Sequence, residues 1–284
     1  MWDAVQRGAR VVLTALAFTG FFTGGLLLSW TVLPLIALFS RDRLVRARRC
    51  QRVLRAAFRV FHGYMRWVRI LHFDPRAVRV TLPDGPCVII ANHPTLVDVT
   101  ALVTVLREVT VVAKPAMYRS FLVGPLLRFC FHIEGAREPM ADGARVLQDC
   151  LDRLAQGLPV LMFPEGTRSP IGGLGRFKRG AFELAARAKV PLVRFGIRCE
   201  PAVLSRQHPW WTTPSRVPYL TIEQLPTLAI AAFDAHAAET VSDVQKEYGL
   251  FVTDNINDRT NPGLQAVSQE LAEGLAGPDC PPMK

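Results

Sequence analysis

The sequence predicts an α/β domain, a mixed and largely parallel sheet flanked by helices, with an N-terminal helical segment embedded in a membrane. The first observation behind this prediction is a series of short apolar segments that alternate with segments of helical periodicity, as strands and their covering helices do in α/β proteins. The second is a long uncharged stretch near the N-terminus, followed by a segment rich in arginine. A chain of 284 residues is long enough for one such domain and an appendage.

The appendage begins with thirty residues, Val11 to Ser40, that carry no charge. As one helix they would extend about 45 Å, well beyond the roughly 30 Å hydrocarbon core of a bilayer. We expect either a single span that leaves the membrane near Pro34 or a re-entrant hairpin that breaks at Gly24-Gly25. The run is too long to be typical of a buried core helix or of a cleaved signal peptide.

A basic helix is predicted at 43–71, which completes a membrane-anchoring region over residues 1–72. Between Arg41 and Arg69 there are ten arginines and one acidic residue, while apolar residues recur every three or four positions. Such a helix is expected to lie in the headgroup plane, with its arginines toward anionic membrane lipid and its apolar face down. A helix packed on the protein, with the arginines on its outer face, is the alternative.

The net charge of +10 belongs to this appendage. Residues 1–80 hold fourteen arginines and three acids, a net of +11, so the remaining twenty bases and twenty-one acids sum to −1. This distribution argues against nucleic acid as a partner and favours a membrane surface. By the positive-inside tendency, the basic segment predicts a protein of the cell inner membrane with its α/β domain in the cytoplasm.

The α/β domain is predicted over residues 73–250 and a C-terminal tail over 251–284. Apolar runs predict strands at 78–82, 87–91, 109–113, 160–163, 192–197 and 219–222. Helical periodicity predicts helices at 95–106, 143–156 and 180–188, and shorter helices at 241–250 and 264–275.

A histidine and a carboxylate lie five positions apart just after the predicted strand 87–91, in the segment 92–98 (NHPTLVD). Proline favours the first position of a helix, so Pro94 suggests a helix that begins here. Side chains on a helix lean toward its N-terminus, so Asp98 could reach back to His93. A carboxylate on one ring nitrogen fixes the tautomer and raises the basicity of the other. The pattern therefore predicts a general base for a hydroxyl group.

A second polar segment, 163–169 (FPEGTRS), also follows an apolar run, at 159–162. In α/β sheets, ligands bind outside the carboxyl ends of the strands. If the two strands are parallel neighbours, both segments lie at the same edge and form one site.

Together the two segments resemble the glycerolipid acyltransferases, specifically the lysophospholipid (1-acylglycerol-3-phosphate) acyltransferase family. The shared pattern is Asn-His-x-x-x-x-Asp, followed about 70 positions later by Phe-Pro-Glu-Gly-Thr-Arg-Ser. The segments 177–180 (FKRG) and 190–193 (VPLV) are similar to later blocks of the family. The resemblance covers about residues 74–222, and the tract 177–211 is similar to a bacterial subgroup associated with aryl polyene lipid assembly.

The resemblance implies the glycerolipid acyltransferase fold and acyl transfer from a thioester, either acyl-CoA or acyl-carrier protein, to the hydroxyl of a lysophospholipid-like acceptor. His93 would be the general base and Asp98 would orient it. No acyl-enzyme is needed, and no Gly-x-Ser-x-Gly elbow occurs in the sequence. No cofactor is implied beyond the acyl donor, which is a substrate.

The expected substrate-binding residues come from the two motifs and the basic segment that follows them. They are Asn92, Glu165, Gly166, Thr167, Arg168 and Lys178. Arg168 is suited to fork onto a phosphate, and Lys178 adds a point charge. Glu165 would repel a phosphate, so we expect it to organise the loop or to bind an acceptor hydroxyl. Backbone N–H groups around His93 or around Gly166 are the expected donors to the oxyanion.

One departure from the family concerns an arginine that usually lies about 27 residues before the Phe of the second motif. That count leads to Ala136, and Arg137 is its neighbour. Because a shift of one residue turns a strand side chain to the other face, Arg137 is not assigned the role. The departure keeps open a catalytically silent lipid-binding protein, and a thioester hydrolase that uses the same base on water is a third reading.

The cysteines and remaining histidines suggest neither disulfides nor metal ligands. The six cysteines are scattered, with none in a Cys-x-x-Cys pair, as suits reduced thiols in the cytoplasm. No ligand spacing joins the histidines, so no metal is expected, and His132 is interpreted as structural.

Overall fold

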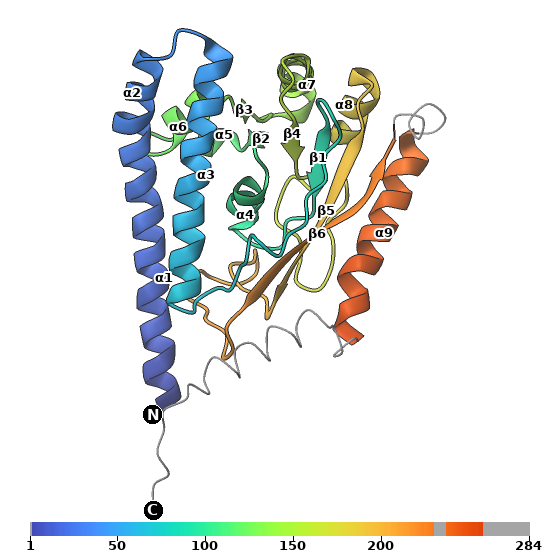
Figure 1. Cartoon of the computed structure of the whole chain (residues 1–284). Helices are drawn as coiled ribbons and strands as arrows, with labels where there is room; N and C mark the ends of the chain where they lie inside the picture. The colour runs from blue at the N-terminus through green and yellow to red at the C-terminus, as the bar shows by residue number, and fades with distance from the viewer. Residues whose placement is uncertain (1, 230–236, 258–284) are drawn as a thin grey trace, which may run out of the picture.

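The computed structural model describes residues 2–229 and 237–257 and contains a six-stranded sheet in the order β3-β2-β4-β1-β5-β6 (Figure 1). The strands are β1 (Val88–Ala91), β2 (Thr110–Ala113), β3 (Ile133–Glu134), β4 (Val160–Met162), β5 (Leu192–Glu200) and β6 (Tyr219–Leu228). Neighbouring strands are parallel except β6, which runs antiparallel to β5. The predicted fold class, a mixed and largely parallel sheet flanked by helices, is confirmed.

Helices cover both faces of this sheet. The helices of the α/β region are α4 (Asp98–Val105), α5 (Pro115–Tyr118), α6 (Gly124–Phe129), α7 (Pro139–Ala155), α8 (Gly180–Ala188) and α9 (Ala237–Asn257). Successive residues of β1 point to opposite faces, so Ile89 packs on the side of α4 while Val88 and Ile90 pack on the side of α7, α8 and α9. All four residues of β1 are buried, as a central parallel strand requires.

Several elements differ from the prediction. No strand forms at 78–82, because the backbone N–H and C=O of Thr81 bond to the side-chain amide of Gln224, each at 2.7 Å, and not to a strand. Strand β3 and helices α5 and α6 were not expected from the sequence. Helix α9 is longer than predicted and crosses the predicted boundary at residue 250, while the predicted helix at 264–275 lies outside the described residues.

The N-terminal region is a long helix that turns back into a second one (Figure 1). Helix α1 (Trp2–Leu27), a π-helical turn η1 (Leu28–Val32) and α2 (Leu33–Leu38) follow one another without a break, so the predicted hairpin at Gly24-Gly25 is wrong. Among the described residues, one helical stretch, Gly8–Leu38, is long and apolar enough to cross a membrane, and 17% of its most apolar window is buried in the protein.

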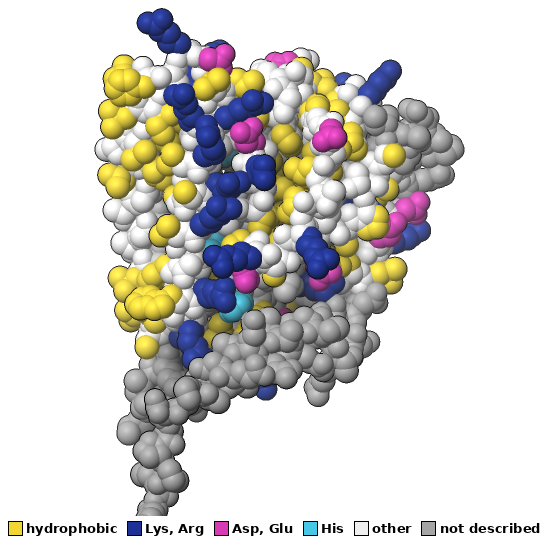
Figure 2. All heavy atoms as spheres, in the orientation of Figure 1, with side chains coloured by type: hydrophobic (Ala, Val, Ile, Leu, Met, Phe, Trp, Pro, Cys, Tyr) yellow, Lys and Arg dark blue, Asp and Glu magenta, His cyan; other side chains and the backbone are white. Residues whose placement is uncertain are grey.

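Helix α3 (Arg43–Trp67) is the predicted basic amphipathic helix, but its apolar face is buried in the protein. Cys50 and Leu54 pack with Leu33 of α2, and the ring of Phe58 stacks on that of Phe21. The expected position with the apolar face down in the membrane is therefore wrong. The alternative holds, a packed helix with arginines outside, and Figure 2 shows basic side chains in a column over α3 beside an apolar edge.

Candidate functional site

The two motif loops meet at the carboxyl edge of the sheet. Strands β1 and β4 are parallel neighbours, with Ile90 opposite Met162, so the residues that follow them emerge side by side. The His93 ring lies against the Phe163 ring, with 4.5 Å between ring centroids. The sequence-based expectation of one site built from two loops is therefore confirmed by the strand pairing.

His93 and Asp98 form a hydrogen-bonded pair, with 2.8 Å between Nδ1 and Oδ2. The carboxylate is fully buried, whereas the His93 side chain keeps 14% of its surface exposed. Thr95 also donates to Asp98, through its backbone N–H at 2.6 Å and its hydroxyl at 2.5 Å. Asp98 is the first residue of α4, where the helix dipole favours a negative charge. The helix does not begin near Pro94 as predicted, because the segment 94–97 is a turn closed onto the Asp98 carboxylate.

This geometry decides which ring nitrogen carries the proton. A carboxylate oxygen only accepts hydrogen bonds, so Nδ1 of His93 must be the donor to Asp98. In the neutral imidazole the lone pair then lies on Nε2. The pair is therefore an oriented base with one nitrogen anchored in the protein and the other free to take a proton.

Glu165 joins the two loops from inside the protein. Its side chain accepts hydrogen bonds from the His93 N–H (3.0 Å), the Ser169 hydroxyl (2.6 Å) and the Gly175 N–H (2.6 Å). A further hydrogen bond joins the two loops, because the backbone N–H of Ser169 donates to the His93 carbonyl at 2.7 Å. Of the two roles considered from the sequence, organising the loop is the one that this geometry supports. A direct contact with substrate does not fit a residue that is 4% exposed.

Asn92 is also turned inward, which corrects its assignment as a substrate-binding residue. Its amide nitrogen donates to the Ile197 carbonyl at 2.8 Å, and its amide oxygen accepts the Ile197 N–H at 2.7 Å. The side chain is 1% exposed. Asn92 therefore ties the end of β1 to β5 and positions the neighbouring histidine.

The cationic residues of the second motif lie around the same loop. Arg168 donates from Nη1 to the carbonyls of Leu204 and Ser205, both at 2.8 Å, and so holds a loop that follows β5. Gly166 adopts a left-handed φ of +69°, and a Cβ atom there would lie 2.7 Å from the Lys178 ammonium nitrogen. The glycine thus makes room for Lys178 at the site. Both Gly166 and Lys178 are exposed, and Thr167 is half-buried.

The backbone N–H groups of His93 and Gly166 themselves are already in use. The N–H of His93 bonds to Glu165 and Ser169, and the N–H of Gly166 donates to the Phe163 carbonyl at 3.0 Å. The expectation that backbone N–H groups around these two residues stabilise an oxyanion stays a prediction for their neighbours in the loops.

Arg137 stands apart from the two loops. It is exposed beyond the end of β3, and its backbone N–H is bonded to Asp142 at 2.8 Å. Among the described residues, no hydrogen bond or ion pair given for Arg137 reaches the site loops. The side chain of Ala136 packs against the core.

Three residues that sequence reasoning overlooked complete the site: Phe163 against the imidazole, Thr95 on the carboxylate and Ser169 between the loops. The Thr-x-x-Asp spacing of Thr95 and Asp98 is a helix N-terminus signature and could have predicted that contact. Cys199 is buried close by, and burial, with Asp98 near it, raises the pKa of its thiol to about 12. The thiol therefore stays protonated and is a poor nucleophile.

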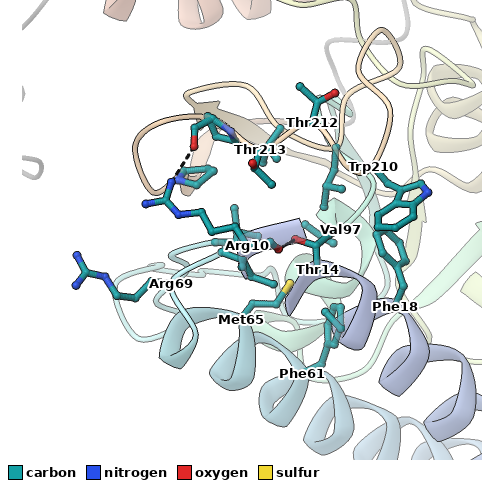
Figure 3. A pocket seen from close by; sticks show the side chains of 17 residues that line it. Arg10, Thr14, Phe18, Phe61, Met65, Arg69, Val97, Trp210, Thr212 and Thr213 are labelled. Atoms are coloured by element: carbon teal, nitrogen blue, oxygen red, sulfur yellow. Dashed lines mark hydrogen bonds between the residues drawn. The ribbon is translucent and has the colours of Figure 1, made fainter. Parts of the chain in front are cut away.

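An apolar groove lies beside the site (Figure 3). It is a narrow groove with a cavity volume of about 40 Å³, and it lies between α1, α3 and the loop 203–218. Val97 and Leu204 line it from the side of the catalytic turn, and the Leu96 N–H donates to the Leu204 carbonyl at 3.1 Å. At the other side, Arg10 donates to the carbonyls of Pro214 and Ser215 at 2.8 and 3.0 Å. The groove is therefore closed by contacts between the N-terminal helix and this loop.

Comparison with known proteins shows which family this chain resembles. The family model described as Acyltransferase matches residues 75–198, the stretch that carries both motif loops. Over these residues the chain is similar to the acyltransferase family. Similar proteins include the 1-acyl-sn-glycerol-3-phosphate acyltransferase beta of Homo sapiens, which is 32% identical over 191 residues, 64% of this chain and 63% of that protein. The 1-acyl-sn-glycerol-3-phosphate acyltransferase alpha of Mus musculus is 25% identical over 91% of this chain and 83% of that protein.

Another similar protein matches over fewer residues. A 1-acyl-sn-glycerol-3-phosphate acyltransferase of Chlamydomonas reinhardtii is 37% identical over 111 residues, so the chain spans 33% of that relative. Among solved structures, the 1-acyl-sn-glycerophosphate acyltransferase PlsC of Thermotoga maritima has the same fold, with a TM-score of 0.66, 16% identity and coverage of 91% of this chain and 100% of that one. The predicted family is thus confirmed, whereas the aryl polyene subgroup stays a prediction.

Proposed function

We propose that this protein is a membrane-associated O-acyltransferase of the 1-acylglycerol-3-phosphate type. It would move an acyl chain from acyl-CoA or acyl-carrier protein to the hydroxyl of a lysophospholipid-like acceptor. The observation that carries the proposal is the pair of His93 and Asp98, bonded at 2.8 Å with the carboxylate buried and the imidazole reachable from solvent. The family match over residues 75–198 includes both members of the pair.

In the proposed mechanism, Nε2 of His93 takes the proton of the acceptor hydroxyl as its oxygen attacks the thioester carbonyl. Asp98 stabilises the imidazolium that forms, through the Nδ1 hydrogen bond. Collapse of the tetrahedral intermediate breaks the carbon–sulfur bond and releases the thiolate, which takes the proton from His93. The products are the acylated lipid and the free thiol of the carrier, so no acyl-enzyme forms.

Arg168 and Lys178 are the proposed ligands of the acceptor phosphate. Lys178 lies beside Gly166, whose missing Cβ leaves room for its ammonium group, and Arg168 follows Gly166 two residues later in the same loop. Nη1 of Arg168 donates to the carbonyls of Leu204 and Ser205. The other N–H groups of the guanidinium can donate to the acceptor phosphate. Thr167, which is half-buried in the same loop, is the proposed hydroxyl donor. The narrow groove lined by Val97 presents an apolar surface next to the dyad, against which hydrocarbon could pack.

The proposed membrane contact is the exposed apolar edge of α1 and α2. An upright helix that crossed the bilayer would carry α3 with it, because Tyr64 bonds to the Leu13 carbonyl and Cys50 packs with Leu33. Each arginine of α3 would then cost about 2.5–3.5 kcal/mol near the bilayer centre. The helix pair therefore lies along one leaflet in this proposal, on the cytoplasmic face of the inner membrane, with the arginines at anionic headgroups.

The test is an assay of purified protein with a panel of lysolipids and with acyl-CoA and acyl-carrier protein as donors. We expect transfer that His93→Ala abolishes and that the control His72→Ala, outside both motifs, retains. Binding of lysolipid without transfer from any donor would instead support a catalytically silent lipid-binding protein. Release of free fatty acid without an acceptor would support a thioester hydrolase.

A further inference from the structure

A second buried histidine, His62, connects the basic helix α3 to the helix that carries Asp98. Its Nε2 lies 2.9 Å from the hydroxyl oxygen of Thr100. Thr100 in turn donates its hydroxyl proton to the carbonyl of Val97 at 2.7 Å. Val97 is the residue before Asp98 and the N-cap of α4, and its carbonyl also accepts the Ala101 N–H at 2.9 Å. A chain of polar contacts therefore runs from α3 to the turn that presents the catalytic carboxylate.

The direction of each hydrogen bond follows from counting protons. Thr100 has one hydroxyl proton, which it donates to Val97, so its oxygen can only accept from His62. His62 Nε2 must therefore carry a proton and donate it, and Nδ1 holds the lone pair. Burial lowers the pKa of His62 to about 4, so the ring stays neutral in this single tautomer near neutral pH.

If His62 only filled the core, it would be less favourable there than an apolar residue of similar size. Its Nδ1 is buried and has no partner among the described groups. The ring packs edge-on against Phe61 and Phe73, so a phenyl or leucine side chain could fill the same space without an unsatisfied nitrogen. The polar contact with Thr100 is what an apolar residue could not supply.

We propose that His62 is a positioning residue for the pair of His93 and Asp98. By holding Thr100, and through it the Val97 carbonyl, it sets the first turn of α4 and keeps the Asp98 carboxylate at Nδ1 of His93. Helix α3 thereby braces the reacting base from outside the motif loops. This inference rests on the proposed function for its catalytic consequence, but the geometry of the pair can be measured without turnover.

The first experiment compares His62→Leu with His62→Gln, because the glutamine amide nitrogen can reproduce the Nε2 donor. His132→Leu is the matched control, since His132 is also buried, with a pKa lowered to about 4 by burial, but it accepts the Val111 N–H of β2 and not a group of α4. The readouts are the NMR resonance of the His93 Nδ1 proton in the full-length protein, which reports the hydrogen bond to Asp98, together with thermal unfolding and kcat/KM.

We expect His62→Leu to move the NMR resonance of the His93 Nδ1 proton upfield, because the hydrogen bond from Nδ1 to Asp98 weakens when the carboxylate is displaced. A displacement of about 1 Å at a reacting group costs roughly a hundredfold in rate, so kcat/KM should fall by about 10- to 100-fold. His62→Gln should restore the resonance and bring kcat/KM to within about threefold of the wild type. Thr100→Val should reproduce His62→Leu, and the double variant should be no worse than either single one.

The proposal is overturned if His62→Leu loses stability as His132→Leu does but leaves the resonance of the His93 Nδ1 proton unchanged. It is equally overturned if glutamine restores nothing while the protein remains folded. Failure of the proposed function has a different signature: wild-type protein with no activity on any donor, but a His93 Nδ1 proton resonance that still responds to His62→Leu. In that case the positioning role stands and the reaction has to be sought elsewhere.

Discussion

Replacing Glu165 by alanine tests whether this residue organises the site or contacts the acceptor. The carboxylate is the shared acceptor of three donors, the His93 N–H, the Ser169 hydroxyl and the Gly175 N–H. Two of these donors belong to the segment 169–175 and one is the backbone N–H of His93. Without the carboxylate, the two loops lose the group that joins them.

The expected loss in the free energy of unfolding depends on whether water can replace the carboxylate as the acceptor for each donor. An orphaned buried donor costs about 1–3 kcal/mol, but His93 and Gly175 are half-buried and can take water in exchange. Ser169 is only 2% exposed, so water cannot replace the carboxylate as a partner for its hydroxyl group. We expect a loss of about 3 kcal/mol in the free energy of unfolding. For a protein of this size, that corresponds to a decrease of about 6–12 °C in Tm.

Thermal unfolding and steady-state kinetics together measure the effect. Because His93 loses its backbone anchor, kcat should fall by about a hundredfold while the KM for the lysolipid changes little. Glu183→Ala is the control, since Glu183 forms a half-exposed ion pair with Arg187 that contributes at most a few tenths of a kcal/mol, about 0.3–0.5. A variant Glu165→Ala with unchanged Tm and a tenfold higher KM would show that Glu165 binds the acceptor, and the reasoning would be refuted.

Three further predictions concern the base, the pH range and the membrane. Asp98→Asn presents an amide N–H to Nδ1 and forces the wrong tautomer, so kcat should fall by about 10⁴-fold; a loss below tenfold would contradict the tautomer assignment. Burial lowers the pKa of His132 from 6.5 to about 4, so the unfolded chain binds a proton that the folded protein excludes. The contribution of His132 to stability should be complete above pH 6.5 and decrease by about 1.4 kcal/mol per unit as the pH falls toward 4. His132→Leu should reduce that slope in calorimetry, and an unchanged slope would speak against it. Glutamates at Leu38 and Phe39, which are 75% and 77% exposed, should release the protein from vesicles in a sedimentation assay. Leu250→Glu, exposed on α9, should leave binding unchanged, and equal binding by all variants would exclude this edge as the contact.

Much of the architecture could be predicted because it depends on local pattern. The apolar runs 87–91 and 192–197 form strands close to their predicted positions. The helix at 180–188 has the bounds that were predicted for it. The strand 78–82 was wrong because its backbone finds a partner in the side chain of Gln224, more than a hundred residues away. Such partners leave no periodic trace in the segment itself.

The sequence by itself was enough to identify His93 and Asp98 as a pair. His93 and Asp98 follow a buried strand at a spacing that brings them together in a single turn, and the second motif ends the neighbouring strand. Parallel strands deliver their carboxyl ends to one edge, so the site could be located before its geometry was known. The uncharged run and the arginines after it likewise identified the appendage from composition.

Only the tertiary structure decided which polar residues face a substrate and which face inward. Asn92 and Glu165 are as polar as Arg168, but they are buried because Ile197, Ser169 and Gly175 satisfy their hydrogen bonds. The same holds for α3, whose apolar face looked ready for lipid and is covered by α1, α2 and the domain. The physical reason is common to both: a side chain's partner is set by chain segments distant in sequence, and burial depends on whether that partner is present.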